Sequence, residues 1–543
     1  MKFKKTIAFG TISGASLLLL ASCGHQNRPR LDSDQTLHWV ETADLPTMDP
    51  SKSTDVVSGG ALNNVDEGLL RIGQGSKLRP GVAKSYEVSK DGKTWTFNLR
   101  HSKWSNGTPV TAADFVYGWR RTVTPKTAAQ YAYLYSHVAN FEAVNKGKKS
   151  PSSLGVKAHG KHQLIVTLSK PQGYFKYLVA SQAFLPQNQQ VVKKYGAKYA
   201  TAADKAVYNG PFKLTDWNGT NDTWTLKKNN RYWDAKATKL KAVKYQVIKD
   251  PGTWLSLYQS GKVDELMTDG LQYRHLKNSP DMHVRESASM FYLEFNQRNG
   301  FFKNNVDARK AISLAINRQS FTHNILADGS HKPKGFVPAG LAKKGHTDFA
   351  DAAYVKSGTA YNLTEARALW KKALQQSGQS SITLNLLADD TPNGKKTIEF
   401  IQSQLDKLPG LKLTTTAVPF NVRLTRSNDG DFDMVVGGWI ADFPDAISFS
   451  SLFTSNNAYN RGRWQNKAYD TAIKNAEGKD ANNPDSRWND LVSAEKTLME
   501  QQGVAPIYQR SQPQMLKPYV HGLQYFPTGA QWDFSRAYIS SHQ

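Results

Sequence analysis

The stretch SITLNLLADDTPNGKKTIEFIQSQLDKLPGLKLTTTAVP, residues 381–419, decides the fold class. Its two ends, residues 381–390 and 411–419, are short apolar runs that are typical of strands. The segment between them, residues 395–408, has the pattern of a helix. A strand, a helix and a strand in this order pair the two strands in parallel through a right-handed crossover. The stretch therefore predicts an α/β fold.

Other segments predict further strands, some of them antiparallel. Residues 85–100 alternate large apolar with polar side chains around the turn signal Asp91-Gly92, which indicates a hairpin. Apolar runs at residues 37–40 and 431–439 are also typical of strands. We therefore expect mixed β-sheets in this α/β chain.

The N-terminus has the pattern of an export signal. Lys2, Lys4 and Lys5 precede an uncharged run at residues 6–20, which is shorter than the roughly 20 residues that a membrane-spanning helix needs. The following residues, LASC, contain the chain's one cysteine, Cys23, and resemble a bacterial lipobox. An ordinary signal followed by a chance cysteine is the alternative.

The lipobox resemblance implies that residues 1–22 are a lipoprotein signal peptide and that Cys23 carries a diacylglyceryl group. Residues 23–33 then form a polar tether, and the mature chain has no disulfide. Two acyl chains on one residue give stable anchoring. We expect the protein on the outer face of the cell membrane, held by the lipid on Cys23.

The chain is strongly basic, with a formal net charge of +25 over 543 residues. A nucleic acid or another polyanion is one conceivable partner of such a chain. However, the lysines are mixed with acids along the chain, and no block of five like charges occurs. This pattern favours a solvated basic surface, and no nucleic-acid partner is predicted.

No motif of an enzyme or a metal site is found. The sequence has no H-E-x-x-H, G-x-S-x-G, G-x-x-x-x-G-K-[ST] or G-x-G-x-x-G pattern, and its 13 histidines are scattered. The acidic run at residues 429–433 lacks the pattern of a calcium loop and is interpreted as a turn before a strand. We therefore predict a binding protein without catalytic residues, metal or cofactor.

Six segments in order resemble the extracellular solute-binding proteins of family 5, and most of all the oligopeptide-binding proteins of ABC importers. The most specific is LRPGVAKSYEVSKDGKTWTFNLRHSKWSNGTPVTAADFVYGWRR, and a late one is GGWIADFPDAISF. The six segments are residues 45–71, 78–121, 208–217, 258–265, 301–321 and 437–449.

The resemblance implies a two-lobed, periplasmic-binding-protein-like (type II) clamp with an extra domain on the first lobe. By similarity, the first lobe is discontinuous, the extra domain follows its first segment, and a hinge joins the lobes. The implied ranges are 34–66, 191–288 and 505–543 for lobe I, 67–190 for the extra domain and 289–504 for lobe II.

The function implied by the resemblance is that of a membrane-anchored extracellular receptor for oligopeptides. Such a receptor captures a peptide in the cleft between its lobes through backbone hydrogen bonds and delivers it to the transmembrane subunits of an ABC permease. The implied receptor is a monomer and not an enzyme. Three alternatives stay in the same class: a receptor for a peptide pheromone, a dipeptide or a nickel chelate. A surface adhesin that uses the basic surface is the alternative from another class.

The motif match implies that Asp442 pairs with the α-ammonium group of the peptide. Gly438, Trp439 and Ile440, with Ala441, form the segment that offers backbone groups to the ligand. Glycine fits where another backbone must approach closely. A helix N-cap or a surface acid is the alternative role of Asp442.

Further ligand-binding residues are implied on other segments, although buried strand residues would give the same pattern. These residues are Asp55, Val56 and Val57, which match a segment that pairs with the peptide backbone, Tyr131, which matches a pocket-lining aromatic, and Glu294 and Asn296, which match a strand near the cleft. Val436 occupies a position where some relatives that prefer short peptides have an arginine. The peptide's C-terminus is therefore held by another basic residue or left free.

Overall fold

The structure is a computed structural model that describes residues 30–73, 77–268, 270–298, 300–481 and 483–542. The predicted signal peptide and Cys23 lie outside the described residues. Within the described ranges, no helix combines the length and the apolar composition that a membrane crossing requires.

The predicted βαβ unit is confirmed. Strands β17 (Ile382–Asp389) and β18 (Leu411–Val418) pair in parallel over their whole length, and helix α13 (Pro392–Leu405) connects them. They belong to a six-stranded sheet of order β13-β20-β14-β19-β17-β18. The other members are β13 (Glu265–Met267), β14 (Met282–Phe295), β19 (Met434–Ile440) and β20 (Val504–Leu516).

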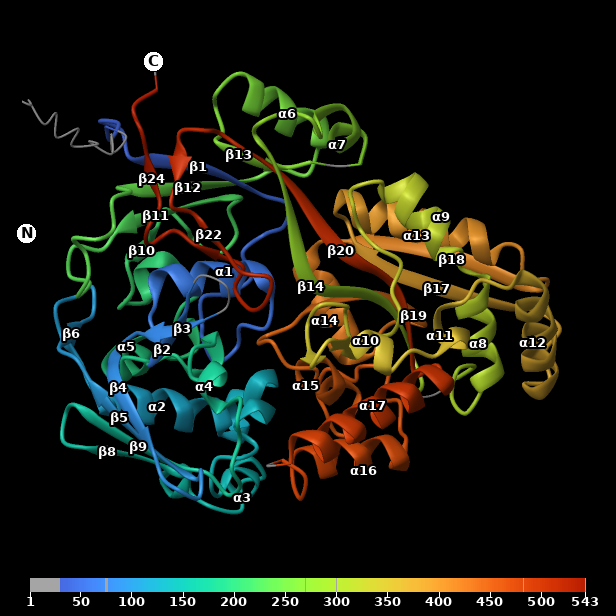
Figure 1. The fold of residues 1–543 in the computed structure, drawn as a ribbon, viewed down its shortest axis with the longest axis horizontal. Coiled ribbons are helices and arrows are strands. Elements are labelled where there is room, and N and C mark those ends of the chain that lie inside the picture. The colour runs from blue at the N-terminus through green and yellow to red at the C-terminus, as the bar shows by residue number, and fades with distance from the viewer. Residues whose placement is uncertain (1–29, 74–76, 269, 299, 482, 543) are drawn as a thin grey trace, which may run out of the picture.

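Helices cover this sheet and bury its apolar face. The core contains Trp370, Ile312 and Ile401, which come from three different helices and are at most 4% exposed. These helices are α12 (Leu363–Gln376), α8 (Val306–Ala315) and α13, and Figure 1 shows them around β17 and β18. Each of them has an asparagine or threonine N-cap whose side chain accepts a backbone N–H, as helix starts prefer.

A second sheet of mixed pairing has the order β1-β12-β11-β10. Strand β1 is parallel to β12, and the other neighbours are antiparallel. Trp39 of β1 contacts the rings of Trp532 and Phe534, with centroids 5.1 and 5.0 Å away, so the two ends of the described chain share one core. The strands are β1 (Thr36–Glu41), β12 (Ala242–Val247), β11 (Thr223–Lys228) and β10 (Phe212–Thr215).

The predicted hairpin lies in a third, antiparallel sheet of order β4-β5-β9-β8. Gly92 adopts a φ of 70° at its turn, and Trp95, Phe97 and Leu99 are buried on one face of β5. Helix α2 (Ala112–Val123) contacts β8 and β9 of this sheet. The strands are β4 (Ala83–Val88), β5 (Thr94–Leu99), β9 (Gln163–Thr167) and β8 (Val156–His159).

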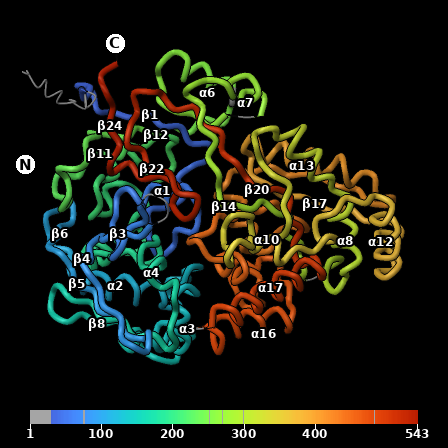
Figure 2. The backbone as a smooth tube through the Cα atoms, in the orientation of Figure 1, coloured from blue at the N-terminus to red at the C-terminus, as the bar shows by residue number. Residues whose placement is uncertain are grey.

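Strands β14 and β20 connect the two halves of the molecule. Figure 2 shows them passing side by side from the half that contains β1 to the half that contains β17. The first part of β14 pairs with β20, and its second part lies between β20 and β19. The pairing of β14 with β20 shifts register between Glu286 and Met290, and again between Phe291 and Tyr292.

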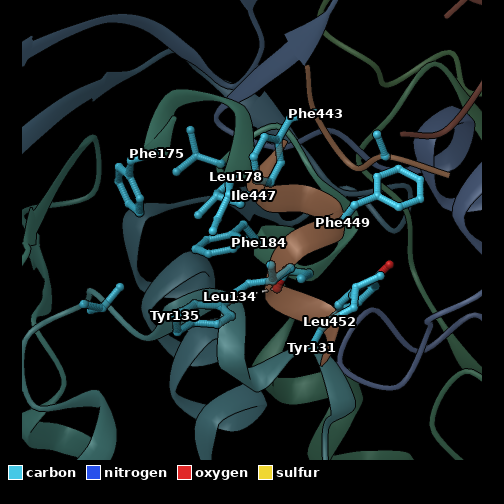
Figure 3. Packing of buried hydrophobic residues seen from close by; sticks show 14 of the residues in the cluster. Tyr131, Leu134, Tyr135, Phe175, Leu178, Phe184, Phe443, Ile447, Phe449 and Leu452 are labelled. Carbon is cyan, nitrogen blue, oxygen red and sulfur yellow. Dashed lines mark hydrogen bonds between the residues drawn. The ribbon is translucent and has the colours of Figure 1, made fainter. Parts of the chain in front are cut away.

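The region that contains the sheet β4-β5-β9-β8 also packs against the half of the molecule that contains β17. Figure 3 shows Leu178 and Phe184 beside Ile447 of α15 (Ile447–Ser450), and all three belong to one buried cluster. The two halves of the molecule therefore contact each other through this buried cluster as well as along β14 and β20.

Candidate functional site

A cavity of about 310 Å³ lies where these parts meet. Its lining comes from segments that are far apart in the chain: the end of β1, the start of helix α1 (Val56–Val65), the turn that contains Tyr131, β19 and the loop after it, and β20. Cavities of this kind, with an apolar lining and a few polar groups, are the usual places for ligands.

Strand β19 exposes part of one edge to this cavity. On one side it pairs with β14 along its whole length, from Met434 to Ile440. On the other side it pairs with β17 only at Met434 and Val435. Gly438, Trp439 and Ile440 line the cavity. The C-terminal half of β19 therefore has an edge without a partner strand in the described chain.

The direction of the backbone groups on this edge follows from the pairing. The N–H of Ala441 donates to the carbonyl of Ala288, so the backbone N–H at position 441 points toward β14. Hydrogen-bonded and non-hydrogen-bonded pairs alternate along an antiparallel ladder. The N–H and C=O groups of Gly438 and Ile440 therefore point away from β14, toward the open edge.

Asp442 follows this edge directly and has an incomplete set of partners. Its Oδ1 accepts a hydrogen bond from the hydroxyl of Tyr131 at 3.2 Å. Its Oδ2 is shielded from solvent and has no hydrogen-bond partner in the described chain. Burial raises the pKa of this carboxyl to about 7, and the hydrogen bond from Tyr131 offsets only part of that rise. A cationic donor beside Oδ2 would complete the site.

The carboxylate of Asp442 does not cap a helix. Helix α15 starts after Ala446, and it is the backbone N–H of Asp442 that donates to Ser448 Oγ at 2.8 Å. The side chain lines the cavity instead of solvent-exposed surface. Of the roles considered from the sequence, this placement favours the one in ligand binding.

Three aromatic rings form one wall beside Asp442. The ring centroids of Tyr131 and Trp439 are 6.2 Å apart, and those of Trp439 and Tyr459 are 4.6 Å apart. The indole Nε1 of Trp439 is shielded and donates to no partner in the described chain. The wall holds the phenol of Tyr131 against Asp442, although these two residues are 311 positions apart in the chain.

Glycine at position 438 has little free space around its Cα atom within this chain. A Cβ atom there would lie 2.9 Å from Cε1 of Phe291, which lines the same cavity. The close neighbour is thus a ring of β14 within this chain. Gly438 is nevertheless one of the residues whose backbone groups point to the open edge.

Asp55, Val56 and Val57 line the cavity at the start of a helix, not on a strand. Asp55 is the N-cap of α1, and its Oδ1 accepts the N–H of Ser58 at 2.7 Å. Val56 is 52% exposed and Val57 is 6% exposed. The segment offers the first turn of a helix to the cavity.

Three of the predicted site residues do not line the cavity. Glu294 is buried and accepts the N–H of Gly462 at 2.6 Å, and Asn296 donates to the carbonyls of Gly430 and Phe432. The N–H of Ala441 is used by Ala288, as described above. The structure therefore gives these residues roles in joining β14 to β19 and to neighbouring loops.

Several charged residues that line the cavity were not predicted from the sequence, among them Glu41 and Arg510. Burial raises the pKa of Glu41, at the end of β1, to about 7, although Arg510 of β20 acts in the opposite direction. In the sequence, Arg510 is a charged residue inside the mostly uncharged run VAPIYQRSQPQML, at 504–516. This single charge in an otherwise uncharged run was the sequence signal by which Arg510 could have been found.

Comparisons with known proteins agree with these features. The family model described as "Bacterial extracellular solute-binding proteins, family 5 Middle" matches residues 77–461. The chain is 35% identical to a dipeptide-binding protein of Lactococcus lactis over 99% of this chain and 100% of that protein.

Two solved structures are similar over 94% of this chain and 100% of theirs. Listeria monocytogenes OppA bound to peptide gives a TM-score of 0.90 at 37% identity, and the pheromone receptor PrgZ gives 0.89 at 34% identity. The likeness to such proteins confirms the predicted two-lobed, periplasmic-binding-protein-like fold. The chain belongs to the bacterial extracellular solute-binding proteins of family 5.

Proposed function

We propose that this protein is a membrane-anchored extracellular receptor that captures oligopeptides between its lobes and delivers them to an ABC transporter. Names of relatives support a peptide ligand, since they include dipeptide-binding and oligopeptide-binding proteins. The lipid on Cys23 and the permease partner are part of the proposal and follow from the resemblance described above.

One observation carries the proposal. In the part of the chain that the structure describes, the carboxylate of Asp442 has a shielded oxygen without a hydrogen-bond partner, and Asp442 follows directly after a strand edge without a partner strand. Leaving a buried charged group unpaired costs free energy, and a ligand that supplies a hydrogen-bonding cation removes this cost. The α-ammonium group of a peptide is such a cation.

A peptide also fits the open edge of β19. An extended chain has N–H and C=O groups at the spacing that Gly438 and Ile440 present, so it can add one strand to this sheet. Backbone pairing of this kind holds peptides of many sequences, and the pair with Asp442 sets their register. The same geometry serves a dipeptide or a peptide pheromone, so the length of the ligand is decided by experiment.

The test starts from ligands that the cell provides. The full chain is purified, denatured, and the released small molecules are identified by mass spectrometry. Peptides found there are synthesised with a free and with an acetylated α-amino group, and both forms are titrated calorimetrically. We expect the free forms to bind much more tightly. Release of metal chelates without peptides, or equal binding of both forms, would contradict the proposal.

A further inference from the structure

The cavity contains one arginine whose guanidinium has no side-chain partner among the residues that the structure describes. Four arginines line the cavity: Arg71, Arg423, Arg461 and Arg510. Three of them are held by side chains of the chain: Arg71 by Asp533 at 3.0 Å, Arg423 by Asp389 at 2.5 Å and Arg461 by Asn428 at 2.9 Å. Among the described residues, the guanidinium of Arg510 has neither an ion pair within 4.0 Å nor a side-chain hydrogen bond.

The position of Arg510 explains why it faces the cavity. It lies on β20, where the pairing with β14 shifts register between Gln509, opposite Met290, and Ser511, opposite Glu286. Irregular pairing of this kind redirects a side chain relative to a regular strand. Arg510 is half-buried, and its neighbours Ser511 and Gln512 line the same cavity.

The charged and titratable groups that the structure describes around Arg510 form no ion pair or side-chain hydrogen bond with its guanidinium. The positive charge of Arg510 acts to lower the pKa of Glu41, and it acts in the same direction on the hydroxyls of Tyr508 and Tyr525. The indole of Trp39 and the backbone of Thr42 also act to lower the pKa of the Glu41 carboxyl. A guanidinium has five N–H donors in a planar fork that fits a carboxylate. Enclosing such a group by lobe closure without an acceptor is unfavourable.

We infer that Arg510 binds a carboxylate of the ligand and thereby makes this protein selective for peptides that present a carboxylate at that point of the cavity. The carboxylate comes either from an acidic side chain or from the C-terminus of the peptide. This inference rests on the proposed function. It gives the cavity two unpaired charges of opposite sign, Asp442 for the ammonium group and Arg510 for the carboxylate.

The experiment compares matched pentapeptides in calorimetric titrations of the full chain. The set is pentaalanine with one Glu or one Gln at each position in turn, and each peptide is made as free acid and as carboxamide. If the source is a side chain, Glu binds about 10- to 100-fold more tightly than Gln at one position. If the source is the C-terminus, the free acid has this advantage over the amide.

The variant Arg510→Gln should abolish whichever preference is found and leave the affinity for the neutral partner peptide nearly unchanged. Arg510→Lys should keep part of the preference. Arg367→Gln is the matched control, because it removes one positive charge from an exposed residue of α12 that does not line the cavity. Binding of the neutral peptide also shows that each variant is folded.

Three results would overturn the inference. They are the absence of any carboxylate preference in the wild type, a preference that survives in Arg510→Gln, and an equal loss of affinity for all peptides in that variant. If the wild type binds none of these peptides, nor those recovered from the cell, the proposed function fails and the inference fails with it.

Discussion

Two carboxylates near the cavity have opposite surroundings. Asp533, on β23 (Trp532–Asp533), accepts hydrogen bonds from Arg71 and Arg79 at 3.0 and 2.8 Å. Burial by itself raises its pKa, but the two guanidinium groups outweigh this and hold the pKa at about 2. Among the described residues, only the phenol of Tyr131 donates to the carboxylate of Asp442, and burial raises the pKa of this carboxyl to about 7.

The difference separates a structural carboxylate from one that is available to a ligand. The chain supplies all that Asp533 needs, so its charge stabilises the fold. The described chain supplies the carboxylate of Asp442 with one hydrogen bond, from Tyr131, and leaves its second oxygen without a partner. Each prediction below changes one side of this comparison, beginning with the largest expected effect.

The variant Asp533→Asn should lower the free energy of unfolding by about 3–5 kcal/mol, because Arg71 and Arg79 lose their counter-charge. Urea unfolding followed by circular dichroism measures this loss. Peptide affinity of the folded variant should stay close to that of the wild type. A loss of stability below about 1 kcal/mol would show that the cluster contributes little.

The variant Asp442→Asn should lower peptide affinity and not folding stability. The affinity for peptides with a free α-amino group should fall by about 2–4 kcal/mol, or roughly 30- to 1000-fold, because the buried charge pair is lost. N-acetylated peptides should bind both proteins alike, and the melting temperature should not fall. Equal losses for both kinds of peptide would remove Asp442 from the role of N-terminal anchor.

The pH dependence should also differ between the two sites. Asp442 must lose its proton to pair with an ammonium group, so peptide affinity should fall as the pH drops below about 7, by up to about tenfold per pH unit. It should also fall above about pH 8, where the α-amino group loses its proton. Titrations from pH 5 to 9 measure both limbs, and N-acetylated peptides should show neither.

The pH dependence of folding stability has opposite signs for Asp533 and Asp442. Asp533 has a folded-state pKa below its ordinary 3.8, so its contribution is present above that pH and is lost as the pH falls toward about 2. Asp442 has a raised pKa, so the unliganded protein loses stability through it as the pH rises from 3.8 to about 7. Unfolding of the two asparagine variants across this range separates the effects.

The smallest effect is expected for Tyr131→Phe. Removing the phenol donor takes away the hydrogen bond to Asp442, at about 1 kcal/mol, and raises the pKa of its carboxyl further. Affinity for free-amine peptides at pH 7 should fall a few-fold, and the acid limb should move to higher pH. Tyr133→Phe is the control, because the hydroxyl of Tyr133 makes no hydrogen bond to Asp442. An unshifted acid limb would contradict the role of Tyr131.

Much of the fold could be predicted from the sequence because local patterns encode it. The strand, helix and strand of residues 381–419 and the hairpin around Gly92 follow from short-range periodicity and turn residues. The motif also singled out Asp442, which the structure places in the cavity. These features depend on neighbours within a few residues.

Tertiary structure alone decided which groups are left without partners. Three features depend on contacts between distant segments: β17 leaves β19 after Val435, Tyr131 is the only donor to the Asp442 carboxylate among the described residues, and Glu294 turns into the core. The same holds for Arg510, whose guanidinium has no ion pair or side-chain hydrogen bond within the described ranges, while the other cavity arginines have side-chain partners. A sequence shows which residues can carry a charge, but long-range packing determines which charges the fold itself neutralises and which it leaves for a ligand.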